Sequence, residues 1–578
     1  MPAVGRICHT DPAESGRLDG NPQLALLNGD EEDPTMAKVS GNDLVVQALQ
    51  DEGVDTTFYV TGGPMVDVAV RCVEMFRTVD VRHEQAAAMA AHAYSRVTGK
   101  PGVCFAASGP GTTNLITGVG NAFLDAVPVV ALGGASAVAQ AGMGAFQEMD
   151  QVGMFKPITK WAERVIDTRR IPEVINKAFR IATGGQPGPV YIDLPGDVLY
   201  KRIEDNEVQF FKKPHEVPRL SGDPNLIRRA IALLKQAQRP LILTGTGVFW
   251  SQAWKELQEF VDLSGIPFYT TPQGRGVVPE DHRLSFLAAR NQAWKEADVV
   301  LVVGTRFNFI IGFGQPPRWA EDVKFIQVDI SDEEIGRNRP VEIGIVGDAK
   351  TVLQQLNEEG RDAFKGRKEL PWVETLRGYD KKTEEKSRTL WNSDALPIHP
   401  MRLFKEVREF MDRDAIIVVD GHETLNFARQ TIPTHVPGHR VNAGPNGCMG
   451  VAVPFGLGAK VAKPNTQVIV LSGDGSFGMN GMEIDTEMRH NIPVLNIVVN
   501  NGGWAAMGGM AAGRDLGFSR YDKMAEVFGA HGEYVEKPQD IRPALERAKA
   551  SGKPSVVNVI CDPNARSSTV SFAAYRAI

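Results

Sequence analysis

Residues 473–501 read GDGSFGMNGMEIDTEMRHNIPVLNIVVNN, and they follow directly on the apolar run TQVIVLS and include a second apolar run, PVLNIVV. In parallel α/β sheets, ligands bind at the carboxyl ends of strands, so Asp474 and Asn501 are expected side by side at such an edge. A carboxylate and an amide oxygen are hard ligands of the kind that Mg²⁺ or Ca²⁺ takes. The pattern therefore predicts a metal and diphosphate site, and the simpler alternative is that GDG and NNGG are two ordinary turns.

The residues around these two side chains also suit a diphosphate. Backbone N–H groups near Ser476 and Phe477, at an expected helix start, are suited to binding phosphate oxygens. Glycines would let the backbone approach such a ligand closely, and four of them flank the two side chains: Gly473, Gly475, Gly502 and Gly503.

The bulk properties describe an ordinary water-soluble protein. A chain of 578 residues suggests about three domains. A net charge of −7 argues against nucleic acid as a partner, and no apolar run reaches the length of about 18 residues that a membrane span needs. The five cysteines form no CxxC pair, which fits a reducing compartment, and we expect a cytoplasmic protein.

The domain organisation follows from an alternation of helical periodicity with short β-branched runs after Val39. This alternation predicts an α/β fold with three doubly wound parallel-sheet domains. Residues 1–36, acidic and without a basic leader pattern, are expected to be a disordered tail. The expected domains cover residues 37–205, 220–355 and 390–578, and the charged stretch 357–388 is expected to be a solvated helix or linker.

A GDG followed one helix and one strand later by NN resembles the diphosphate-binding signature of thiamine-diphosphate enzymes in the acetolactate synthase-like superfamily. The resemblance implies Mg²⁺ held by Asp474, Asn501 and the backbone oxygen of Gly503. It implies the three-domain fold of that family for the whole chain after Val39. It also implies a homodimer as the minimum unit, with a homotetramer expected, because the first and third domains of different subunits face each other across the cofactor.

The group that activates the cofactor is expected in the stretch DVRHEQAAAMAAHAYSRVTG. Taken alone, Glu84 could be a helix-start carboxylate favoured by the macrodipole. The match to the family's RHEQAA pattern implies instead that Glu84 is the activating glutamate. The same resemblance places Met449 under the bent cofactor, and a core methionine is the alternative.

The middle block points to a branch of the family. GTRFNFIIGFG and VDISDEEIGRNR resemble the 2-hydroxyacyl-CoA lyases and oxalyl-CoA decarboxylases, whose middle domain can hold ADP, more than the FAD-binding acetolactate synthases. Asp329, at an expected strand end, suits a ribose hydroxyl, although an unliganded strand end is an equal alternative. The candidates for contacts to ADP are Arg164, Arg290 and Asp329.

The sequence after Asn501 departs from those relatives. They commonly read NNGGIY, whereas this chain reads NNGGWAAMGG, so Ala505 replaces the tyrosine. A wider, less polar pocket favours a ketone leaving group, as from 2-hydroxyisobutyryl-CoA, and predicts a lyase that acts on an acyl-CoA and releases formyl-CoA. The base for the 2-hydroxyl proton is left open, and the candidate pocket residues are Gln147, His422, Glu423, Trp504, Ala505 and Arg566.

Three rival functions stay open at this point. Two are enzymes of the same family, an oxalyl-CoA decarboxylase and an acetolactate-synthase-like carboligase that carries FAD. The third is a non-catalytic family member that serves as a binding subunit, against which the intact Glu84, Asp474 and Asn501 argue.

Overall fold

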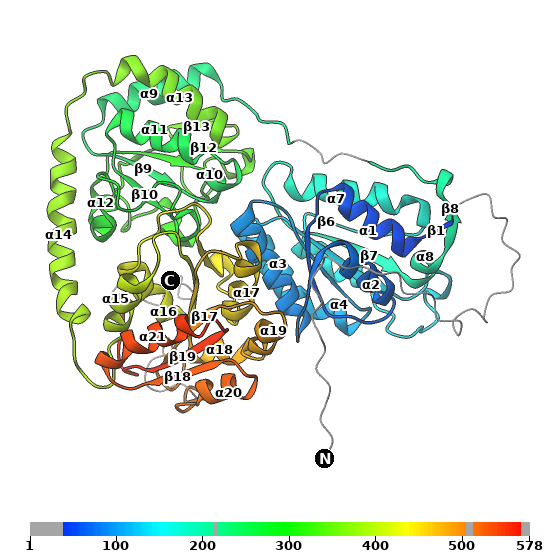
Figure 1. The fold of residues 1–578 in the computed structure, drawn as a ribbon. Helices are drawn as coiled ribbons and strands as arrows, with labels where there is room; N and C mark the ends of the chain where they lie inside the picture. The colour runs from blue at the N-terminus through cyan, green and yellow to red at the C-terminus, as the bar shows by residue number, and fades with distance from the viewer. Residues whose placement is uncertain (1–37, 212–216, 505–511, 568–578) are drawn as a thin grey trace, which may run out of the picture.

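The computed structural model describes residues 38–211, 217–504 and 512–567, which form three α/β domains (Figure 1). Each domain is built around one parallel sheet. The predicted fold class, three doubly wound parallel-sheet domains, is confirmed. The expected tail, residues 1–36, lies outside the described residues.

The N-terminal domain has a six-stranded sheet with the order β3-β2-β4-β5-β7-β6. Its strands are β2 (Thr56–Tyr59), β3 (Arg77–Asp80), β4 (Gly102–Ala106), β5 (Val129–Ala135), β6 (Trp161–Arg164) and β7 (Val190–Pro195). Its helices are α1 (Gly41–Asp51), α2 (Val66–Met75), α3 (Glu84–Thr98), α4 (Pro110–Asn114), α5 (Ile116–Asp125), α6 (Gln151–Phe155), α7 (Ile171–Thr183) and α8 (Gly196–Tyr200). The short strands β1 (Lys38–Ser40) and β8 (Arg202–Glu204) form a separate antiparallel pair.

The C-terminal domain repeats this topology, with the sheet order β15-β14-β16-β17-β19-β18. Its strands are β14 (Ile416–Asp420), β15 (Arg440–Asn442), β16 (Val468–Gly473), β17 (Leu495–Asn500), β18 (His531–Val535) and β19 (Ser555–Ile560). Its helices are α15 (Pro400–Phe410), α16 (His422–Thr431), α17 (Ala452–Ala462), α18 (Asp474–Asn480), α19 (Glu483–Arg489), α20 (Tyr521–Val527) and α21 (Ile541–Ala550). When the strands are numbered within each domain, both six-stranded sheets read 2-1-3-4-6-5.

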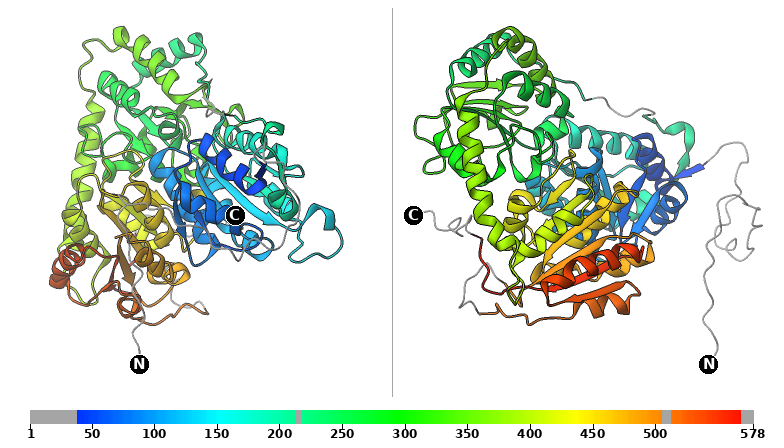
Figure 2. Two further views of the ribbon diagram at one scale, coloured as in Figure 1. Left: turned by 45° about the vertical axis from the view of Figure 1, so that its right-hand side comes forward. Right: turned by 60° about the vertical axis from the view of Figure 1, so that its left-hand side comes forward.

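The middle domain has a five-stranded sheet with the order β10-β9-β11-β12-β13. Its strands are β9 (Pro240–Thr244), β10 (Phe268–Thr270), β11 (Val299–Val303), β12 (Lys324–Asp329) and β13 (Ile343–Val346). Its helices are α9 (Pro224–Gln236), α10 (Thr246–Trp250), α11 (Trp254–Ser264), α12 (Arg290–Glu296) and α13 (Ala349–Ala363). The long helix α14 (Pro371–Trp391) then runs along the outside towards the C-terminal domain (Figure 1; Figure 2).

The two outer domains share one hydrophobic core, in which α3 packs against α17. Six residues of α3 are alanines, whose short side chains let another helix approach its backbone. A Cβ added at Gly458 of α17 would lie 2.2 Å from the carbonyl oxygen of Ala90. Small residues thus bring the two helix backbones close together. The opposite faces of the two sheets are covered by α1, α2 and α7 and by α15, α16 and α21.

Seven strands were not predicted from the sequence: β1, β6, β8, β10, β13, β15 and β18. All seven lie at sheet edges. An edge strand is covered on one side only and does not need the continuous apolar run of a central parallel strand; every residue of β6, for example, is only partly buried. Of the helices in the described part of the chain, none combines the length and the apolar character that a membrane crossing requires.

Candidate active site

The first part of the site lies where β16 and β17 end. These strands are parallel neighbours, with Gly473 paired to Val499. Gly473 caps α18, which begins at Asp474, and Asn501 follows directly after β17. The sequence prediction that the two side chains meet at one sheet edge therefore has its structural basis in this register.

Three oxygen atoms converge there, and we call them the oxygen cradle: Asp474 Oδ1, Asn501 Oδ1 and the carbonyl oxygen of Gly503. The amide oxygen of Asn501 faces the Gly503 oxygen at 2.8 Å and Asp474 Oδ1 at 3.2 Å. Turned by 180°, the amide would donate a hydrogen bond to each of them. Neighbouring ligands of an octahedral Mg²⁺ lie about 3 Å apart, because Mg–O distances are about 2.1 Å. The oxygen cradle thus fits a magnesium ion. Without a metal, the turned Asn501 amide can hydrogen-bond to the other two oxygens.

Asp474 has the electrostatics of a cation ligand. Its side chain is buried, Oδ1 accepts the backbone N–H of Gly475 at 2.9 Å, and Oδ2 has no hydrogen-bond partner among the described residues. Burial raises the pKa of Asp474 to about 6, against the opposing effect of backbone N–H groups. A buried carboxylate with an unused oxygen is stabilised by a bound cation. Among the described residues, no group of three or more His, Cys, Asp or Glu side chains is placed to hold a metal ion.

The backbone around the cradle is too crowded for side chains. A Cβ at Gly475 would lie 2.5 Å from the indole of Trp504, so this ring covers the first turn of α18. A Cβ at Gly503 would meet the carbonyl oxygen of Arg514 at 2.2 Å. Ser476 is buried in the same turn of α18. Trp504 is thus placed over the start of α18, whereas Ala505 lies outside the described residues.

The second part of the site surrounds Glu84, the first residue of α3. Asn114 at the end of α4 donates a hydrogen bond from Nδ2 to Glu84 Oε2 at 2.9 Å, and Oε1 lies beside Gly111. Gln147 packs against Gly109, in the loop that leads into α4. The structure therefore brings Gln147 and Glu84 to the same region of the N-terminal domain. Asn114 was not singled out from the sequence, because an asparagine that ends a short helix carries no signal of its own.

In the part of the chain that the structure describes, no hydrogen bond joins Glu84 to Asp474 or Asn501. Met449 lies beside the cradle domain's helices, half-exposed, and precedes Gly450, whose carbonyl accepts a hydrogen bond from Asn480 at 2.6 Å. Glu84 and the metal-binding candidates are therefore not joined by a direct hydrogen bond between their side chains.

Three of the six residues predicted for the substrate pocket, His422, Glu423 and Arg566, form a small polar group where α16 begins. His422 Nδ1 lies 3.7 Å from Glu423 Oε1, and the backbone N–H of Ser567 donates to Glu423 Oε2 at 2.9 Å. Burial would raise the pKa of Glu423, but His422 and the Ser567 N–H outweigh it, so the pKa is lowered. Arg566 is exposed next to Ser567 and donates to backbone carbonyls of Pro563 and Ala565. His422, Glu423 and Arg566 are thus neighbours in the structure.

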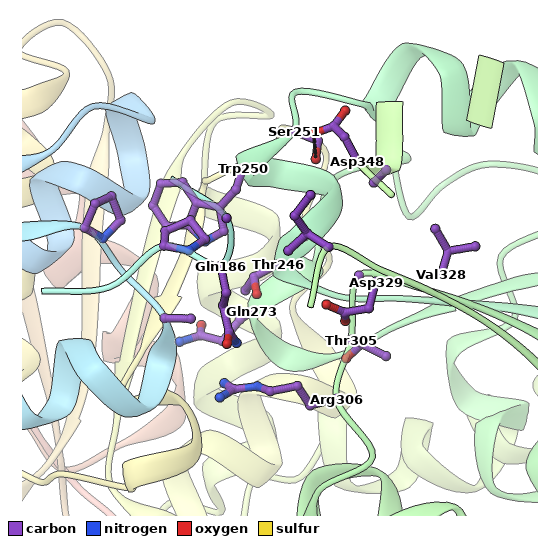
Figure 3. A pocket seen from close by; sticks show the side chains of 18 of the residues that line it. Gln186, Thr246, Trp250, Ser251, Gln273, Thr305, Arg306, Val328, Asp329 and Asp348 are labelled. Carbon is purple, nitrogen blue, oxygen red and sulfur yellow. Dashed lines mark hydrogen bonds between the residues drawn. The ribbon is translucent and has the colours of Figure 1, made fainter. Parts of the chain in front are cut away.

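A cavity of about 510 Å³ opens at the carboxyl ends of the middle-domain strands (Figure 3). Asp329, at the end of β12, lines it, and burial raises the pKa of this carboxyl to about 6. Trp250 and Arg306 line it as well (Figure 3). Strand order reverses between β9 and β11, and such a switch point is where doubly wound sheets bind nucleotides.

The three residues predicted to contact a nucleotide do not come together in this cavity. Only Asp329 lines it. Arg164, in β6, forms an ion pair with Asp193 at 2.5 Å, and the guanidinium of Arg290 lies 5.2 Å from the ring centroid of Trp294. Arg306, which directly follows the GT of the quoted GTRFNF stretch, lines the cavity and was missed.

Comparisons with known proteins identify the domain families in the chain. Models described as "Thiamine pyrophosphate enzyme" match the chain in three parts: the N-terminal TPP binding domain over residues 39–154, the central domain over 227–356 and the C-terminal TPP binding domain over 421–559. A 2-hydroxyacyl-CoA lyase from Arabidopsis thaliana is 37% identical over 92% of this chain and 97% of its own.

Two other activities occur at nearly the same similarity. An acetolactate synthase large subunit from Mycobacterium tuberculosis is 36% identical over 90% of this chain and 95% of its own. An oxalyl-CoA decarboxylase from Escherichia coli is 35% identical over 91% of this chain and 95% of its own. These identities differ too little to choose among the three activities.

Proposed function

Because the chain belongs to the thiamine pyrophosphate enzymes, we propose that it is a 2-hydroxyacyl-CoA lyase. It cleaves the C1–C2 bond of a 2-hydroxyacyl-CoA and yields formyl-CoA and a ketone or aldehyde. The observation that supports a metal-dependent use of the cofactor is the oxygen cradle, in which the Asn501 oxygen faces the oxygens of Asp474 and Gly503 at distances suited to Mg²⁺.

The residues of the chain divide the work as follows. Asp474, Asn501 and the Gly503 carbonyl would hold Mg²⁺ beside the diphosphate of the cofactor. When bound, the cofactor would supply carbanion chemistry at its thiazolium ring. Glu84 would hold or release a proton next to the aminopyrimidine ring, and because Asn114 fixes Oε2 of Glu84, this proton would be carried by Oε1 beside Gly111.

The substrate choice rests on the residues that follow the cradle. Trp504 presents an apolar ring over α18, and the sequence there lacks the tyrosine of the CoA relatives. An apolar wall suits a methyl-bearing leaving group better than a second carboxylate, which would be buried without a donor. We therefore favour 2-hydroxyisobutyryl-CoA, which would release acetone.

The proton of the 2-hydroxyl needs an acceptor. Glu423 is our candidate of the neighbouring pair, because the backbone N–H of Ser567 and the adjacent His422 hold its carboxylate in place. His422 would then orient the carboxylate, and Arg566 would meet a phosphate of CoA. The middle-domain cavity would hold ADP, with Asp329 accepting from a ribose hydroxyl. The active unit would be a homodimer, and two such dimers would form a homotetramer.

The deciding experiment supplies the purified protein, loaded with thiamine diphosphate and Mg²⁺, with one candidate substrate at a time. Formyl-CoA together with acetone from 2-hydroxyisobutyryl-CoA supports the lyase, and lactoyl-CoA tests an unbranched substrate. Formyl-CoA from oxalyl-CoA alone would make the protein a decarboxylase, and acetolactate from pyruvate would make it a synthase. The nucleotide released by heat gives an independent reading, because ADP agrees with the CoA enzymes and FAD with the synthase.

A further inference from the structure

The segment that carries Glu84 is held by a helix of the other outer domain. Between the end of β3 and the start of α3, the chain runs through Arg82 and His83. The carboxylate of Glu483, the first residue of α19, accepts the backbone N–H of Arg82 at 3.1 Å and that of His83 at 3.2 Å. Two consecutive peptide groups before Glu84 are thus fixed by one side chain of the C-terminal domain.

Further contacts fasten the same segment on both sides of Glu84. At the far end of α19, Arg489 donates to the side chain and the carbonyl of Asp80 at 2.6 and 2.7 Å, and His490 contacts the Asp80 carboxylate at 2.7 Å. On the other side of Glu84, the side chain of Gln85 donates to Asn480 Oδ1 at 2.8 Å. Residues 80–85 therefore lie along α19 and the end of α18.

The carboxylate of Glu483 is buried between the two domains. Its side chain is buried, with only 1% of its surface exposed, and burial raises its pKa. A buried carboxylate is costly unless hydrogen-bond donors compensate it. Its donors are the two N–H groups of the Glu84 segment and the hydroxyl of Thr486 at 2.6 Å. Two of the three donors to the Glu483 carboxylate therefore belong to the N-terminal domain.

We propose that Glu483 is a positioning residue that orients Glu84 through the backbone of Arg82 and His83. Fixing these two peptide planes sets the direction of the Cα–Cβ bond of Glu84, and hence where its carboxylate lies. A displacement of about 1 Å in such a group can lower a rate by about a hundredfold. The inference rests on the proposed function only in that Glu84 must take part in the reaction.

Glu487 provides a matched comparison on the same helix. It lies one turn after Glu483, is fully buried, and has a pKa raised well above its usual value by burial. Its hydrogen bond is with Asn496 Nδ2 of β17, inside the C-terminal domain, at 3.0 Å. Glu487→Gln therefore repeats the loss of a buried carboxylate without touching the Glu84 segment.

The test compares Glu483→Gln with Glu487→Gln in the full-length protein. Hydrogen–deuterium exchange of the cofactor-free chain should show faster exchange at Arg82 and His83 in Glu483→Gln only. In the loaded enzyme, kcat of Glu483→Gln should fall about ten- to hundredfold, with KM and the thiamine diphosphate affinity within twofold of the unchanged protein. Equal kcat losses in both variants, or faster exchange with unchanged kcat, would overturn the proposal.

A milder variant and one control complete the design. Glu483→Asp keeps a carboxyl group but moves it away from Arg82 and His83 by one methylene. This variant replaces Glu483→Gln in the test if Glu483→Gln does not fold. Full kcat in folded Glu483→Asp would also overturn the proposal. Glu84→Gln separates the two hypotheses. If Glu84→Gln turns over normally, the proposed function fails, whereas an inactive Glu84→Gln beside a fully active Glu483→Gln removes only the positioning role.

Discussion

At the scale of single residues, the oxygen cradle makes a two-sided prediction for Asp474→Asn. The new amide can donate to the facing oxygens of Asn501 and Gly503, so the metal-free protein should melt no lower than the unchanged one. Mg²⁺ loses its only carboxylate ligand there, so Mg²⁺-dependent binding of thiamine diphosphate should weaken by at least about a hundredfold. Calorimetric titration with and without Mg²⁺, together with thermal melting, measures both effects.

The matched control is Asp329→Asn, which makes the same chemical change at another buried aspartate whose pKa burial raises to about 6. It should leave Mg²⁺-dependent thiamine diphosphate binding unchanged. If Asp474→Asn kept that binding at full strength, the assignment of the cradle to a metal would be wrong.

Glu84→Gln should separate binding from turnover. A neutral amide retains the shape of Glu84 but cannot exchange a proton, and the substitution leaves the cradle intact. Thiamine diphosphate affinity should stay within a fewfold, while kcat falls by at least about a hundredfold, as for loss of a general acid–base group. Stopped-flow binding and steady-state turnover on the same preparation give the two numbers, and near-normal kcat would exclude Glu84 from the reaction.

At the scale of elements, the strand ends carry the titratable groups, and β12 yields a pH prediction. Burial raises the pKa of Asp329 to about 6, so this carboxyl becomes neutral as the pH falls below about 6. A ribose hydroxyl donates more strongly to an ionised carboxylate than to a neutral carboxyl group. The affinity of the middle-domain cavity for ADP should therefore fall as the pH drops through 6.

Asp329→Asn controls for the titration of the nucleotide itself. The variant should bind ADP more weakly at pH 7.5 and lose the part of the pH dependence that Asp329 contributes. Equilibrium dialysis between about pH 5 and 8 measures this difference, and identical profiles for the two proteins would remove Asp329 from the nucleotide site.

At the scale of the whole molecule, the two outer domains depend on the close contact of α3 with α17. Gly458→Ala places a Cβ 2.2 Å from the carbonyl oxygen of Ala90, which is backbone and cannot turn away. Overpacking of this kind typically costs about 1–3 kcal/mol. The midpoint of thermal unfolding should fall, and kcat should fall with it, because α3 carries Glu84 at its first position.

Gly378→Ala is the matched control in a different helix. Gly378 lies in the exposed part of α14, and a Cβ added there meets nothing within 4 Å. Alanine in a helix interior is favoured over glycine by about 0.5–1 kcal/mol, so this variant should melt at the same temperature or slightly higher. If both alanines had the same effect, the helix contact would not limit the stability.

Local sequence was sufficient for the central strands and for placing Asp474 and Asn501 at one sheet edge, whereas the roles of these two residues stay predictions. A strand buried on both faces is apolar along its length, as β4 and β11 are, and it can be recognised without knowing its neighbours. Parallel strands also end at one edge, so Asp474 and Asn501 could be expected together. The resemblance in the RHEQAA stretch then pointed to Glu84.

Tertiary structure decided what depends on distant partners. The seven strands that the sequence did not predict are three to five residues long, and each has a neighbouring strand on one side only. Arg306 lines the middle-domain cavity, whereas Arg164 and Arg290 contact Asp193 and Trp294. The sequence around an arginine does not distinguish these cases. Glu483 meets the segment before Glu84 only because two domains about 400 residues apart in sequence pack together. Composition and periodicity report how a residue is buried, whereas the partner of a buried polar group is set by the packing of the whole chain.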